Sequence, residues 1–276
     1  MLINKIMKNM DENRSRRRDR QREGEREEGV PRTKGYVMDI KWNALDAIIS
    51  LVFLAAILVG IYFGSAKLFV LLQNEQFFNT SNINNISFTV LYGIQVILML
   101  GVVWFFALFR RKAHLRDLGL RYYSIAKTIW YSFLSLLAIF LVSFLYVFLM
   151  NSIFGMEAPS SKIEVLVENS SISSNILLVV VALVAPFSEE IFFRGFVYSA
   201  FKKSWGVNAG LFLSSFLFAL VHLEIYSFIP LMIIGWILAY LFEKTKSLMP
   251  AIFLHGVYNL ILILILLGRL EIIKLY

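Results

Sequence analysis

Long apolar runs separated by short polar segments fill the chain from about residue 43 onwards. Seven such runs lie at about 43–72, 87–109, 127–150, 175–201, 207–222, 228–242 and 248–268. A helix of about 20 apolar residues crosses the hydrocarbon core of a bilayer. The pattern therefore predicts an all-α fold, a polytopic transmembrane helical bundle of about seven spans, in which the fifth and sixth spans are short.

Basic residues are distributed unevenly among the polar connections. The connection 73–86 contains no Lys or Arg and 151–174 contains one, whereas 110–127 contains six. Lysine pairs also lie in 202–206 and in 243–247. Because cytoplasmic loops are enriched in Lys and Arg, the N-terminus and the three Lys/Arg-rich connections are expected in the cytoplasm.

The first 40 residues differ in composition from everything that follows. Residues 11–28 contain no apolar side chain, and such a segment cannot bury a core, so a disordered cytoplasmic tail is predicted for residues 1–40. Acidic residues interleave its arginines and aromatic residues do not, which favours contact with membrane lipid over nucleic acid. The whole chain is 58% hydrophobic, above the roughly 50% typical of soluble domains. Residues 41–276 are therefore expected to form a transmembrane domain.

Three ionisable side chains interrupt the fourth apolar run: Glu189, Glu190 and Arg194. An ionisable group at membrane depth costs at least about 2.5 kcal/mol, so its default interpretation is functional. On a helix, Glu190 and Arg194 are four residues apart and can pair, whereas Glu189 points about 100° away from Glu190. A buried salt bridge that holds two helices together explains this pair as well as a functional site does. Glu189 needs a role of its own.

Two further apolar runs carry histidine. Phe218 and His222 end the fifth run, and His255 and Asn259 lie in the seventh, where a spacing of four puts both on one helix face. A single membrane histidine is usually part of an interhelical hydrogen bond. The chain has only three histidines, however, and the two in apolar runs accompany the carboxylates in the C-terminal half. Their joint occurrence favours one shared polar site.

Pro186 and Gly195 flank the charged residues and shape the helix around them. Proline removes a backbone hydrogen bond and kinks a helix, so an irregular turn is expected about one turn before Glu189. Backbone groups freed there need partners, which suits a water-filled cavity better than lipid. Gly195 permits close approach of a neighbouring helix.

Carboxylates, imidazoles and an amide are sufficient to hydrolyse an amide bond. A carboxylate takes a proton from water, and imidazole or amide N–H groups hold the oxyanion. Glu189, His222 and His255 are also an acceptable zinc set that leaves one position for water. Each comes from a different run, however, and carboxylates behind the histidines are hard to find, since Glu224 alone is near His222 and none adjoins His255. We therefore expect no required cofactor and keep zinc as the alternative.

The motifs together resemble one protein family. They are Glu189-Glu190-x-x-x-Arg194, Phe218-x-x-x-His222 and His255-x-x-x-Asn259, with Asp117-Leu118-Gly119-Leu120 ahead of the third run. Their order and spacing are similar to those of the CPBP (Abi) intramembrane proteases, which include CAAX proteases, type II CAAX prenyl endopeptidases and bacteriocin-processing enzymes. The resemblance covers roughly residues 110–265 and implies a catalytic core there.

The resemblance also implies a role for each motif residue. Glu189 is then the base that activates water and His222 helps to position it, while His255 and Asn259 bind the oxyanion. The supporting residues, which hold the helix and tune the base, are then Glu190, Arg194 and Phe218. Members of this family have been described both as metalloproteases and as glutamate-dependent hydrolases without metal.

Two other classes of function stay open. A non-catalytic membrane immunity or resistance factor of the same fold would be expected to lose motif residues, and all are present here. A proton-coupled transporter is expected to show repeat symmetry, and none is visible. For the leading hypothesis, an intramembrane endopeptidase of a prokaryotic plasma membrane, the partners are membrane lipid and a protein or peptide substrate, lipid-modified or not. The cut is expected near the substrate's C-terminus or its membrane-proximal part.

The predicted spans place the histidines at different depths. His255 lies about two turns from the cytoplasmic side, whereas His222 lies near the outer end of its run. A shared site requires similar depths, so either the fifth and sixth runs are re-entrant or their boundaries shift by about one turn.

Overall fold

Every secondary-structure element in the described part of the chain is a helix, which confirms the predicted all-α fold. The structure is a computed structural model that describes residues 38–73, 80–159, 164 and 173–273. The expected disordered tail lies outside the described residues as far as Val37. In the remaining part of the predicted tail, residues 38–40, Met38 and Ile40 pack against the hydrophobic core.

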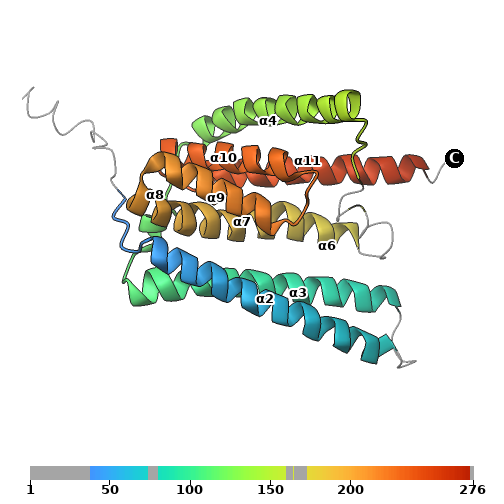
Figure 1. The fold of residues 1–276 in the computed structure, drawn as a ribbon, viewed down its shortest axis with the longest axis horizontal. Helices are drawn as coiled ribbons and strands as arrows, with labels where there is room; N and C mark the ends of the chain where they lie inside the picture. Colours follow the sequence, from blue (N-terminus) through green and yellow to red (C-terminus); the bar gives the residue numbers. More distant parts are fainter. Residues whose placement is uncertain (1–37, 74–79, 160–163, 165–172, 274–276) are drawn as a thin grey trace, which may run out of the picture. The chain divides into compact units, whose positions relative to one another are not determined.

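The helices follow the predicted apolar runs closely (Figure 1). The fourth run is one continuous helical segment in which α-helical and π-helical stretches alternate. The elements are α2 Ala44–Gln73, α3 Thr80–Val103, η1 Trp104–Arg110, η2 Leu115–Leu118, α4 Ile125–Phe154, α6 Ser174–Val179, η3 Val180–Val184, α7 Ala185–Glu190, η4 Ile191–Tyr198, α8 Ser199–Trp205, α9 Val207–Val221, α10 Phe228–Thr245 and α11 Met249–Ile273.

Six helical segments among the described residues are long and apolar enough to cross a membrane. The fifth predicted span, α9, has 15 residues. At 1.5 Å per residue it is about 22 Å long, short of the roughly 30 Å hydrocarbon core of a bilayer. The described residues therefore contain the seven predicted apolar helices, and the fifth is short, as predicted.

The segment from α6 to α8 lies at the centre of the helix packing. In Ser174–Trp205, 17 of 32 residues are buried, against three of 30 in Ile125–Phe154. Helices α9, α11 and α3 pack directly against the central segment, whereas α4 lies alongside α10 and α11 (Figure 1). The charged residues of the fourth run are therefore surrounded by protein, and most of the surface of α4 is left uncovered by the other helices.

The basic connections meet at one end of the helices. Asp46, at the start of α2, is buried and accepts hydrogen bonds from Arg110 at 2.6 Å and Arg111 at 3.0 Å. Lys203 Nζ donates to the carbonyl of Ile40, and Arg121 donates to that of Lys246. These contacts put the basic connections on the same side, as the charge pattern predicts.

A stagger of the helices along their length removes the predicted difference in depth. A Cβ added at Gly195 would lie 3.4 Å from Leu248, the residue before α11. The central helix continues for ten residues beyond Gly195 to Trp205, about 15 Å, so α11 begins well inside the bundle. Glu189 is six residues from Gly195 and His255 is seven residues from Leu248, which is about 10 Å along the helix in each case. Glu189 and His255 therefore lie at similar depth.

The same reasoning places His222 at this depth. A Cβ added at Gly210 would lie 3.0 Å from the Lys202 backbone nitrogen, and α9 packs on α8. His222 follows Gly210 by 12 residues and Glu189 precedes Lys202 by 13, so both lie about 18–20 Å further along. The offset helix starts, rather than re-entrant runs, reconcile the depths.

Candidate active site

Glu190 and Arg194 form the predicted salt bridge in the centre of the bundle. Arg194 Nη1 lies 2.7 Å from Glu190 Oε1, and the two side chains are 1% and 0% exposed. Arg194 Nη2 also donates to the carbonyl of Gly235 at 3.3 Å. Its guanidinium carbon lies 4.3 Å from the centroid of the Phe218 ring, a cation–π arrangement that compensates for lost hydration. The pair is therefore buried, hydrogen-bonded and held between the central segment, α9 and α10.

His255 connects α11 to both glutamates. Its Nδ1 lies 2.8 Å from Glu190 Oε1, the same oxygen that accepts from Arg194, and its Nε2 lies 3.9 Å from Glu189 Oε2. An ionised carboxylate can only accept, so Nδ1 donates to Glu190. Nε2 then faces Glu189, as an acceptor in the neutral ring and as a donor in the imidazolium.

The expectation that no carboxylate lies behind His255 is wrong. It rests on distance along the sequence, and Glu190 is 65 residues from His255 in the chain. The two meet because α11 packs against α7. A carboxylate that fixes the orientation of an imidazole is therefore present at this histidine.

Phe218 packs against both imidazoles. Its ring centroid is 4.7 Å from that of His222 and 5.8 Å from that of His255. His222, which follows the last residue of α9, has its Nδ1 2.6 Å from the backbone oxygen of Phe218. This contact directs the Nδ1 hydrogen to the carbonyl and leaves Nε2 as the reactive nitrogen of the neutral ring.

Asn259 is placed one turn beyond His255, as predicted, but its side-chain amide contacts backbone. Its Nδ2 donates to the carbonyl oxygen of Val181 at 2.9 Å. Val181 lies in η3, the π-helical turn just before Pro186. The irregular turn expected from proline is thus observed, and π-helical turns are common at functional sites.

The Asp117–Leu120 segment supports the site from the basic end. A Cβ at Gly195 would lie 2.9 Å from the Leu118 carbonyl oxygen, so the predicted close approach at Gly195 is confirmed. Gly119 has φ +88°, and its carbonyl accepts from the Leu248 backbone N–H at 2.9 Å. The segment therefore fixes the start of α11 against the helix that carries the glutamates.

Tyr92 is a candidate that the sequence does not single out. This α3 residue lies close enough to Glu189 for the two groups to interact electrostatically, and its ring centroid is 4.9 Å from that of Phe88. No sequence signal marks it, because tyrosine is common in membrane helices near the interfaces. Helix α3 is therefore one wall of the region around Glu189.

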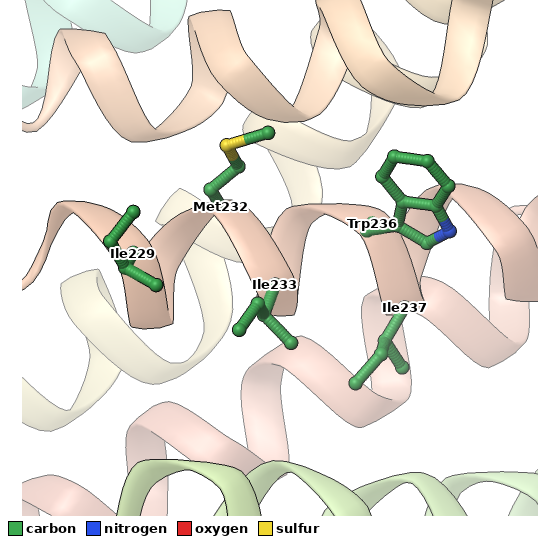
Figure 2. Close-up of a pocket in the computed structure, with 5 residues that line it drawn as sticks. All are labelled: Ile229, Met232, Ile233, Trp236 and Ile237. Carbon is green, nitrogen blue, oxygen red and sulfur yellow. The ribbon is translucent and has the colours of Figure 1, made fainter. Parts of the chain in front are cut away.

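The described residues do not gather a metal site. No group of three or more His, Asp or Glu side chains among them is arranged to hold an ion, so Glu189, His222 and His255 are not brought together as a complete ligand set. An open apolar pocket of about 310 Å³ lies elsewhere, on one face of α10 (Figure 2). It is lined by Ile229, Met232, Ile233, Trp236 and Ile237, and by none of the candidate site residues.

Comparisons with known proteins find similarity in the C-terminal half of the chain. Residues 171–261, about a third of the chain, match the family model described as Type II CAAX prenyl endopeptidase Rce1-like. The chain is 32% identical over 85 residues to "Putative membrane peptidase YdiL" of Bacillus subtilis (strain 168), covering 30% of this chain and 34% of the relative. It is 30% identical over 87 residues to "UPF0177 protein YbdI" of Lactococcus lactis subsp. lactis (strain IL1403), covering 31% of this chain and 46% of the relative.

The chain thus spans less than half of the length of these curated relatives. No solved structure matches it significantly. The matched segment runs from just before α6 into α11 and contains every site residue predicted from the sequence, whereas Tyr92 and Asp117–Leu120 lie outside it. Residues 171–261 are therefore similar to the Rce1-like type II CAAX prenyl endopeptidases.

Proposed function

We propose that this protein is an intramembrane endopeptidase in which Glu189 activates the attacking water. The observation that carries the proposal is the separation of the two adjacent glutamates into different surroundings. Glu190 is fully buried and neutralised by Arg194, whereas Glu189 is 14% exposed and faces His255 Nε2 at 3.9 Å. Two carboxylates with different surroundings take different roles, so Glu189 is the one available for chemistry.

The proposed reaction uses the groups around Glu189 in sequence. Glu189 takes a proton from water, and the water oxygen attacks the carbon of the scissile carbonyl. The second hydrogen of the Asn259 amide and the Nε2 hydrogen of His255 in its imidazolium form hold the resulting oxyanion. Glu189 then returns the proton to the amide nitrogen as the C–N bond breaks, and His222 positions the water.

The membrane setting defines the partners in this proposal. The substrate is a protein or peptide segment cut near its C-terminus or its membrane-proximal part, with or without a lipid modification, and the surrounding lipid is the other partner. The N-terminus and the basic end of the helices face the cytoplasm of a prokaryotic cell. The name of the Bacillus subtilis relative, "Putative membrane peptidase YdiL", and the match of residues 171–261 to the Rce1-like family model support this proposal.

The test is hydrolysis by the purified protein in lipid vesicles. A library of membrane-anchored peptides is incubated with these vesicles in water enriched in ¹⁸O and analysed by mass spectrometry. The proposal predicts new C-termini that each carry one ¹⁸O, absent from vesicles that hold His255→Ala. Cleavage that is identical with His255→Ala, or no cleavage of any peptide, would count against it.

A second candidate is a zinc peptidase that uses Glu189, His222 and His255. The observation that favours it is that both histidines have Nδ1 directed at an oxygen, Glu190 Oε1 and the Phe218 carbonyl. Histidine ligands are usually oriented in this way. Because the described residues do not gather the three ligands, we derive no step through zinc, which would supply a Lewis acid when bound.

Metal removal distinguishes the two candidates. Active protein is analysed for bound metal, dialysed against a chelator and assayed again before and after zinc is returned. Unchanged cleavage after the chelator treatment is expected from the favoured proposal. Stoichiometric zinc, with activity lost on removal and restored on return, would transfer the assignment to the zinc peptidase.

A further inference from the structure

We propose that Asn259 is a positioning residue that replaces the backbone hydrogen bond missing at Pro186, and so fixes the glutamate-bearing α7 against the histidine-bearing α11. The stability part of this inference stands on backbone geometry alone. Its consequence for catalysis rests on the proposed function.

The hydrogen-bond register of η3 accounts for the Asn259 contact. The backbone N–H of Ala185 bonds to the carbonyl of Val180, five residues back, as in a π-helix. In the same register the next N–H, at position 186, would reach the carbonyl of Val181. Proline has no N–H, and a buried carbonyl without a partner is unfavourable. Asn259 Nδ2 donates to this carbonyl at 2.9 Å.

A close backbone approach places Asn259 within reach of that carbonyl. A Cβ added at Gly256 would lie 2.8 Å from the carbonyl oxygen of Ala182. Gly256 precedes Asn259 by three residues, so both lie on the side of α11 that faces η3. The absence of a side chain at position 256 lets α11 approach η3 closely enough for the Asn259 hydrogen bond.

This contact links directly to the candidate site. His255 is the neighbour of Gly256, and Glu189 and Glu190 lie about two turns beyond Val181 on the central helix. The hydrogen bond from Asn259 therefore sets the axial position of α11 relative to α7. That position determines both His255 distances, 2.8 Å to Glu190 and 3.9 Å to Glu189.

The positioning role differs from oxyanion binding and is separable from it by experiment. An amide nitrogen carries two hydrogens, and the contact with Val181 uses one. Loss of oxyanion binding alone lowers kcat and leaves stability unchanged. Loss of positioning lowers both, and a backbone N–H restored at position 186 should recover both.

The experiment is a double-mutant cycle with Asn259→Ala, Pro186→Ala and the double variant, each as the full chain in lipid nanodiscs. Thermal unfolding is measured, and kcat and KM for a cleaved peptide are measured well below every Tm. We expect Asn259→Ala to lower Tm by about 2–4 °C and kcat by about 10²-fold with KM unchanged. In the Pro186→Ala background, Asn259→Ala should lower Tm by less than half as much. The double variant should have a kcat at least tenfold above that of Asn259→Ala alone.

Three results would overturn the inference: an unchanged Tm for Asn259→Ala, an equal Tm loss in both backgrounds, or a kcat loss that Pro186→Ala does not relieve. If Pro186→Ala does not fold, Gly256→Ala replaces it in the cycle, because a methyl group there pushes α11 from Ala182 and weakens the same bond. Strict additivity of Gly256→Ala and Asn259→Ala would then contradict the proposal. The Tm measurements need no substrate, so they test the positioning role of Asn259 even if the proposed peptidase activity fails.

Discussion

His255 donates a hydrogen bond of 2.8 Å to Glu190, although the two residues are 65 positions apart in the chain. The acceptor, Oε1, also receives Arg194 at 2.7 Å. One carboxylate oxygen thus orients the imidazole and neutralises the guanidinium. Glu190 is therefore held in place by two partners, and Glu189 lies beside Nε2, the other ring nitrogen of His255.

Arg194→Ala should destabilise the protein severely. The substitution leaves Glu190, which is 0% exposed, without its cation, and breaking a buried pair in this way costs about 3–5 kcal/mol. Thermal unfolding in detergent measures the effect, with Arg116→Ala at an exposed position as the matched control. Adding Glu190→Gln to Arg194→Ala should recover part of the loss. A Tm for Arg194→Ala equal to that of the control would contradict this account of the pair.

Gly119→Ala should destabilise the basic end of the helices. Gly119 has φ +88°, and an added Cβ would clash with the Phe242 ring, so the methyl group introduces backbone strain and overpacking of about 1–3 kcal/mol. Gly101→Ala in α3 is the control, because nothing lies within 4 Å of a Cβ there. The two variants are compared by thermal unfolding. Equal Tm values for the two variants would show that the Asp117–Leu120 segment does not fix the start of α11.

Single cysteines test the proposed orientation, since the chain has no native cysteine. Lys112 and Glu157 are both exposed and lie in connections predicted on opposite sides of the membrane. In intact cells, an impermeant thiol reagent should label Glu157→Cys and spare Lys112→Cys, and after lysis it should label both. The reverse pattern in intact cells would place the basic end outside.

The apolar runs and the four-residue spacings were sufficient to predict the helices and the Glu190–Arg194 pair. Both depend on local periodicity, which the sequence carries directly. The contact between His255 and Glu190 was not predictable, because it depends on how two distant helices pack. The Asn259 contact escaped prediction for another reason: the π-helical register before Pro186, rather than side-chain chemistry, creates the acceptor. The relative depths of His222 and His255 depend on helix offsets that no single run encodes.

The role of each candidate site residue remains a prediction, and the Glu189 carboxylate is central to all of them. The most direct measurement is kcat for one cleaved peptide with Glu189→Gln, which keeps the size of the side chain and removes its ability to act as a base. Glu157→Gln, the same change at an exposed position, is the control. We expect Glu189→Gln to lower kcat by at least about 10²–10⁴-fold at an unchanged Tm, and Glu157→Gln to match the wild type. A Glu189→Gln variant that folds and retains kcat close to that of the wild type would contradict the proposal that Glu189 activates the water.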